Sequence, residues 1–61
     1  MTFTILTSDG NVWFVTDFAS KKELIEVINK WNNIEAYKTT SSQSGWTVFT
    51  RNIVACRQWD N

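Results

Sequence analysis

The side chains that could do chemistry are few in this 61-residue chain. It has no histidine and one cysteine, Cys56, so a histidine general base and a histidine-activated thiol are both absent. A zinc site normally takes four cysteine or histidine ligands, which one cysteine cannot supply. Gly10 and Gly45 are far apart and each suits a turn rather than a phosphate-binding loop. We therefore expect a protein that is not an enzyme and that holds no metal or cofactor.

Aromatic and basic residues near the C-terminus offer a second kind of chemistry. Trp46, Arg51, Arg57 and Trp59 could stack bases and hold phosphates if they shared one face of a sheet. Six basic residues balance six acidic ones, however, so the chain lacks the basic excess that is typical of nucleic-acid-binding proteins. Binding of single-stranded nucleic acid through these four residues is therefore an alternative hypothesis and not the main one.

Short runs rich in β-branched and aromatic residues predict the strands that must position these side chains. Asp9 and Gly10 separate the first two runs. This dipeptide is typical of a two-residue hairpin turn, because both turn positions must tolerate positive φ. Similar runs recur in the second half of the chain, with a polar Ser/Thr-rich loop between them. The expected strands cover residues 2–7, 12–16, 34–40, 46–50 and 53–59.

Residues 20–31 carry the signals of a helix. Ser20 is followed three residues later by Glu23, a pattern that predicts a capping box at the first turn. Four apolar side chains then recur at helical spacing: Leu24, Val27, Ile28 and Trp31. Such a stripe indicates a helix that covers one face of a sheet. Asn32 and Asn33 tolerate the left-handed conformation that often ends a helix.

The order of these elements resembles the β-grasp arrangement of bacterial immunoglobulin-binding domains. The resemblance lies in element order and length, and it carries over no binding residue. We predict a single small α+β domain over residues 1–61. Its one helix would pack on a four- or five-stranded, mostly antiparallel sheet, in the order ββαββ(β) and with a β-grasp-like layout.

A second hairpin is expected from strands 46–50 and 53–59, joined by a two-residue turn at Arg51-Asn52, and apolar side chains fall on both faces of each hairpin. A two-residue turn at 9–10 places Leu6 opposite Trp13 and on the same face as Val15. One helix covers only one face, and fully burying one large apolar side chain is worth about 1.5–3 kcal/mol. The second face should therefore be covered by another protein surface. The expected protein-binding residues are Leu6, Trp13 and Val15, with Trp46 and Trp59 as further anchors.

These observations favour a non-catalytic, protein-binding accessory module that acts by covering a surface of its partner. The partner would be a second copy of the chain, a host protein, or both, and a homodimer is the simplest assembly. Chains of this size without a catalytic set are common among products of phages and mobile elements, so an inhibitor or modulator of a host protein is the specific hypothesis. A structural subunit of a larger assembly is the remaining alternative.

The sequence also bears on where the protein acts. Residues 1–7 lack the basic segment that opens a signal peptide. No run approaches the roughly 20 apolar residues that a membrane-spanning helix needs. We therefore expect a cytoplasmic protein that does not enter a membrane, with Cys56 as a reduced thiol.

Overall fold

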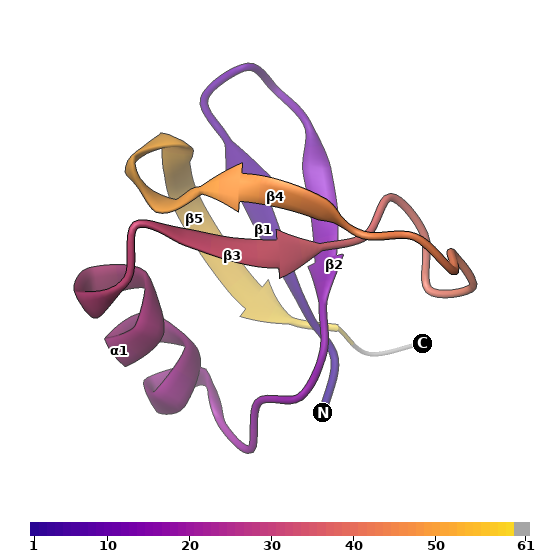
Figure 1. Cartoon of the computed structure of the whole chain (residues 1–61). Coiled ribbons are helices and arrows are strands. Elements are labelled where there is room, and N and C mark those ends of the chain that lie inside the picture. The colour runs from indigo at the N-terminus through magenta and orange to yellow at the C-terminus, as the bar shows by residue number, and fades with distance from the viewer. Residues whose placement is uncertain (60–61) are drawn as a thin grey trace.

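One helix and five strands follow one another within residues 1–59, the part of the chain that the computed structural model describes (Figure 1). The elements are β1 (Phe3–Thr7), β2 (Val12–Val15), α1 (Lys21–Lys30), β3 (Asn33–Ala36), β4 (Trp46–Phe49), a 3-10 turn (Thr50–Asn52) and β5 (Ile53–Gln58). Every strand pair is antiparallel. The predicted α+β class is therefore confirmed, although β3 ends four residues earlier than expected.

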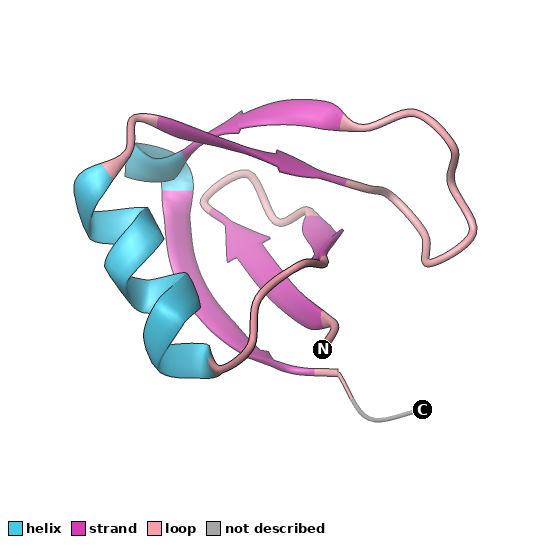
Figure 2. Ribbon diagram, turned by 60° about the horizontal axis from the view of Figure 1, so that its bottom comes forward, coloured by secondary structure: helices cyan, strands magenta, loops and turns pink. Residues whose placement is uncertain are grey.

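The strands form two sheets, and the prediction of a single four- or five-stranded sheet with a β-grasp-like layout is wrong. One sheet has the order β2-β1-β5, and the other pairs β3 with β4. The β3-β4 hairpin crosses over the first sheet, and α1 lies along one side of the space between them (Figures 1 and 2). Phe14 and Tyr37 exchange two backbone hydrogen bonds of 2.7 and 2.8 Å, so an isolated bridge links β2 to the end of β3.

The expected C-terminal hairpin does not form, because the 3-10 turn redirects the chain between β4 and β5. The Thr50 hydroxyl donates to the carbonyl of Trp31 (2.6 Å), and the Thr50 amide donates to the carbonyl of Asn32 (3.0 Å). These bonds tie the turn to the end of the helix. The Asn52 carbonyl accepts from the Ser8 amide (2.8 Å), which directs β5 to the free edge of β1.

The β1–β2 loop holds three residues between its last paired positions, not two. The Thr7 amide donates to the Asn11 carbonyl (2.9 Å), and the Gly10 amide donates back to the Thr7 carbonyl (2.9 Å). Gly10 has a φ of 88°, as expected at the last position of a three-residue hairpin loop. An odd loop length shifts the register by one residue, so Ile5 and not Leu6 lies opposite Trp13.

The core lies between the two sheets and is closed on one side by α1. Phe3 and Ile5 occupy its centre, together with the buried side chain of Leu24 from the helix. The β3-β4 hairpin lies above the three-stranded sheet in Figure 2, and Ile34, Ala36 and Val48 are its buried apolar residues. The buried apolar residues are Phe3, Ile5, Trp13, Val15, Leu24, Ile34, Ala36 and Val48.

The helix begins as predicted and ends differently. The Ser20 hydroxyl accepts from the Glu23 amide (3.2 Å), as predicted for the cap, but the Glu23 carboxylate accepts from the amide of Ala19 (3.3 Å) and not from that of Ser20, as a capping box would require. Trp31 has an extended backbone and is 65% exposed. It therefore ends the helix and does not join the buried stripe, and no left-handed asparagine is involved.

The β3–β4 loop places Gly45 against two hydrogen-bonded side chains, those of Glu35 and Tyr37. The Tyr37 hydroxyl donates to Oε1 of Glu35 (2.7 Å). Gly45 lies so close to both that an added Cβ would stand 2.5 Å from Cγ of Glu35 and 3.1 Å from the Tyr37 ring. A side chain at position 45 would therefore displace the side chain of Glu35.

Helix α1 has ten residues, and within residues 1–59 no helix has the length and apolar character needed to cross a membrane.

Candidate functional site

Trp13 and Val15, which we expected beside Leu6 on an exposed patch, point into the core. Trp13 is 8% exposed and Val15 is fully buried, whereas Leu6 is 38% exposed. The observed register pairs Ile5 with Trp13, which places both side chains on the inner face of the sheet and Leu6 on the other. The predicted surface patch of Leu6, Trp13 and Val15 is therefore wrong.

The buried indole of Trp13 is held by its neighbours on several sides. Its Nε1 donates to the hydroxyl of Thr7 (3.0 Å), which in turn donates to Oδ1 of Asp9 (2.6 Å). Lys38 Nζ lies 3.9 Å from the centre of the Trp13 ring, and Trp46 packs against the ring edge-on at 6.0 Å. Trp46 thus covers part of Trp13 while remaining partly exposed.

Trp46 and Trp59, the other two expected anchors, lie on different sides of β2. Trp46 contacts Trp13, and Trp59 packs edge-on against Phe14 with ring centres 5.1 Å apart. Trp13 and Phe14 are consecutive residues of a strand, so their side chains point to opposite faces. The two tryptophans therefore cannot serve one common surface.

The four residues of the nucleic-acid hypothesis are dispersed as well. The Arg51 guanidinium lies 5.0 Å from the centre of the Phe49 ring, away from Arg57 and Trp59. Trp46 lies on the inner side of β2. Only Arg57 and Trp59 line the same hollow of the surface. The fold therefore brings together two of the four residues.

The side chains of the β2-β1-β5 sheet that point away from the core form a surface that we call the outer face. Its residues are Thr4, Leu6, Val12, Phe14, Ala55, Arg57 and Trp59. Val12 is 52% exposed and Trp59 is 36% exposed. Sequence reasoning missed Val12 and Ala55, because a two-residue turn assigns Val12 to the opposite face. The odd length of the loop, which an Asp-Gly dipeptide does not reveal, would have identified Val12, and Ala55 joins the face through the pairing of β5 with β1.

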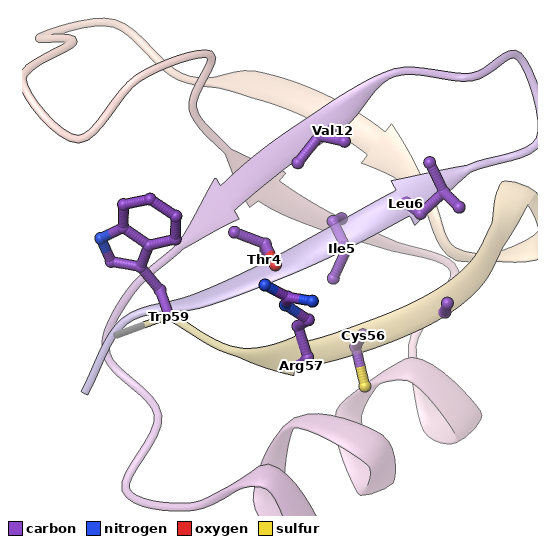
Figure 3. A pocket seen from close by; sticks show the side chains of 8 residues that line it. Thr4, Ile5, Leu6, Val12, Cys56, Arg57 and Trp59 are labelled. Atoms are coloured by element: carbon purple, nitrogen blue, oxygen red, sulfur yellow. The ribbon is translucent and has the colours of Figure 1, made fainter. Parts of the chain in front are cut away.

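A shallow groove of about 350 Å³ runs across the outer face (Figure 3). Leu6 and Val12 flank one end of it and Trp59 stands at the other. The side chain of Arg57 lies between them, across β1 and beside Thr4. The groove is lined by Thr4, Ile5, Leu6, Val12, Ala55, Cys56, Arg57 and Trp59.

Within residues 1–59, Arg57 is the only charged residue that lines the groove, and no carboxylate of that part of the chain lines it. The acidic side chains with hydrogen-bond partners lie elsewhere: Asp9 is bonded within the β1–β2 loop, Glu23 at the start of α1, and Glu35 to Tyr37. The outer face thus combines exposed aliphatic side chains, one exposed tryptophan and one cation.

Two side chains with shifted pKa values lie outside this face. Hydrogen bonds, above all from Thr7 and then from Asn11, hold the pKa of the Asp9 carboxyl below its usual value of 3.8. The hydrogen bond to the Glu35 carboxylate raises the pKa of Tyr37 above its usual value of 10.0, because ionisation would break it and set two negative charges side by side. Within residues 1–59, no three histidine, cysteine or acidic side chains gather as metal ligands would.

No protein-family model matches the chain, and neither curated proteins nor solved structures show a significant similarity to it.

Proposed function

We propose that this protein is a non-catalytic protein-binding module that uses the outer face of its β2-β1-β5 sheet. The protein would act in the cytosol as an inhibitor or modulator, by occupying a surface that its partner needs. The observation that carries the proposal is the uncovered apolar character of the outer face. Leu6 and Val12 stand exposed at one end of a groove and Trp59 at the other, while α1 and the β3-β4 hairpin both pack on the inner side.

A domain of this size has little stability to spare. Burial of apolar surface is worth about 25 cal/mol per Å², and small domains are only marginally stable. An antiparallel sheet usually carries polar side chains on the face that it turns to water. The exposed Leu6, Val12 and Ala55 depart from that pattern. Contiguous apolar patches rimmed by polar residues are typical of interaction sites.

Nucleic-acid binding receives less support from the geometry. Arg57 and Trp59 share the groove, but Trp59 packs edge-on against Phe14. The aliphatic side chains that surround them offer no surface on which a base could stack. The balanced charge of the chain gives no general attraction for phosphates.

A matched pair of variants tests the proposal. Leu6 and Ile25 are aliphatic residues of nearly equal exposure, 38% and 41%, but Leu6 lies on the outer face and Ile25 on α1. Proteins that the wild type captures from a cell lysate are compared with those captured by Leu6→Gln and Ile25→Gln. We expect Leu6→Gln to lose the specific partner and Ile25→Gln to keep it. Equal capture by both variants would exclude the outer face as the binding surface.

A further inference from the structure

The charge of Arg57 restricts what can cover the outer face. Its side chain lies across β1 between Leu6 and Val12 at one end of the groove and Trp59 at the other (Figure 3). Any apolar surface that covers Leu6 and Val12 also removes water from the guanidinium. A buried charge without a partner is strongly destabilising, and among residues 1–59 no carboxylate lines the groove to neutralise it. The occupant must therefore bring an anion to Arg57.

Residues 1–59 of a second copy do not meet that requirement. Two outer faces packed against each other would enclose two Arg57 side chains and no acid from the described lining of the groove. The area is also small. Three strands of four to six residues span about 250 Å² in projection, given strand spacings of about 4.8 Å and rises of about 3.4 Å per residue. Stable interfaces bury about 800 Å² on each side. The face suits a short segment better than a whole domain.

The spacing of the groove side chains indicates the form of that segment. Along β1 the face has three successive levels: Leu6 with Val12 and Ala55, then Thr4 with Phe14 and Arg57, then Thr2 with Trp59. Adjacent levels are two residues of an extended strand apart, about 6.8 Å. An extended peptide presents every second side chain to the surface beneath it at this same spacing. Its central side chain would meet Arg57, and its outer two would meet apolar surface.

The anion is better supplied by a protein carboxylate than by a nucleic-acid phosphate. The side chains on both sides of Arg57 are apolar, so the neighbours of the anion must be apolar too. A polypeptide can alternate acidic and apolar side chains at this spacing, whereas the phosphates of nucleic acids are flanked by polar sugars. Arginine binds carboxylates well, because its planar guanidinium can donate two parallel hydrogen bonds.

We infer that the outer face binds a short extended segment of another protein, in which an aspartate or glutamate lies two residues from an apolar side chain on each side. The carboxylate pairs with Arg57, one apolar side chain packs on Leu6, Val12 and Ala55, and the other packs on Trp59. This inference rests on the proposed function and adds the chemistry of the partner.

Selection from a random peptide library displayed on phage tests the inference with the intact chain. We expect wild-type protein to enrich peptides with an acidic residue flanked at two-residue spacing by apolar residues. A synthetic copy of an enriched peptide should bind Arg57→Gln at least about tenfold more weakly, the usual worth of a hydrogen bond to a charged group. Changing the acidic residue of the peptide to its amide should weaken binding to the wild type similarly and binding to Arg57→Gln hardly at all.

Two results would overturn the inference. One is that no peptide is enriched, or that the enriched peptides lack acidic residues. The other is equal binding of the acidic peptide to wild-type protein and Arg57→Gln. Arg51→Gln is the matched control, because Arg51 lies over Phe49 and outside the groove, and it should bind the peptide as the wild type does. The proposed function fails separately, when Leu6→Gln captures the cellular partner as well as Ile25→Gln does.

Discussion

Trp13 can be buried although its indole carries a polar N–H group, because Thr7 lies on the same face of the sheet. The Thr7 hydroxyl accepts from Nε1 of Trp13 and donates to the carboxylate of Asp9. A single hydroxyl thus connects the core to the β1–β2 loop. Removing it would leave a donor without an acceptor in the interior, which generally costs more than the loss of an exposed hydrogen bond.

Thr7→Val should lower the free energy of unfolding by about 1–3 kcal/mol, because the substitution keeps the β-branched shape but leaves the Trp13 indole N–H unsatisfied. Urea denaturation followed by tryptophan fluorescence measures the change. Thr47→Val, at an exposed position of β4, provides the control and should change stability by less than about 0.5 kcal/mol. Equal effects of the two variants would show that the buried hydrogen bond contributes nothing.

The lowered pKa of Asp9 makes stability depend on pH. Folding lowers this pKa, so the contribution of Asp9 to stability is complete above about pH 5 and is lost as the pH falls below about 4, through the lowered value of the folded state. The Asp9→Asn variant has no carboxyl group at this position, so its stability lacks this dependence on pH. We therefore expect the stability difference between wild-type protein and Asp9→Asn to shrink as the pH falls from 6 to 2, as thermal unfolding at each pH would measure. A constant difference would mean that the carboxylate gains nothing from Thr7 and Asn11.

At the scale of elements, the β1–β2 loop decides which side chains become core and which become surface. Three residues bridge the strands, and Gly10 supplies the positive φ that this loop needs. No atom lies within 4 Å of the position that a Cβ on Gly10 would occupy. The requirement for glycine here therefore concerns only the backbone.

Gly10→Ala should cost about 1 kcal/mol of stability, the usual penalty for a side chain in the left-handed region. Gly10→Asn should cost less, because asparagine tolerates this conformation. Chemical denaturation of both variants measures the difference. An alanine variant as stable as the wild type would show that the loop readily adopts another shape.

The start of α1 gives a second test at this scale. Ser20→Ala removes the hydroxyl that accepts from the Glu23 amide, and we expect a loss of about 1 kcal/mol. Ser44→Ala, in the exposed β3–β4 loop, is the matched control and should be nearly neutral. The measurement is again chemical denaturation, and a loss no larger than that of the control would remove Ser20 as the helix cap.

The elements themselves could be predicted from local sequence, since their signals are local. Ser20 and Glu23 marked the start of the helix, and the β-branched runs marked all five strands. The face assignment failed because it depends on the parity of one loop, and Asp9-Gly10 suits loops of either parity. The pairing of β5 with β1 failed because it depends on contacts between distant residues, such as the bond from Ser8 to Asn52. Both errors affect the candidate site: Leu6 and Trp59 were predicted as anchors, but Val12 and Ala55, which lie beside Leu6, were not.

At the scale of the whole molecule, both elements that cover the three-stranded sheet lie on the same side of it. Helix α1 and the β3-β4 hairpin both lie on the inner face of the three-stranded sheet, which leaves the outer face open (Figure 2). The groove lining of that face is apolar around one cation. Two such faces packed together would bring two Arg57 cations into one interface, so we expect Arg57 to disfavour a dimer through this face.

Arg57→Met should promote self-association, since it leaves the outer face wholly uncharged along its groove. Sedimentation equilibrium would show the wild type near its monomer mass of 7.1 kDa and the variant shifted toward a dimer. Arg51→Met, which removes a cation from the Phe49 ring instead, should stay monomeric. A wild-type dimer that Leu6→Gln dissociates would show that a second copy does cover the outer face.

The crowding around Gly45 offers a way to trace the ancestry of this fold. A larger residue there would displace Glu35 and break its bond to Tyr37, so the three positions should change together or not at all. Apolar residues can replace one another during evolution without such coupling. Distantly related proteins could be recognised by this pattern: an acidic residue, an aromatic residue two positions later and a glycine eight positions after that.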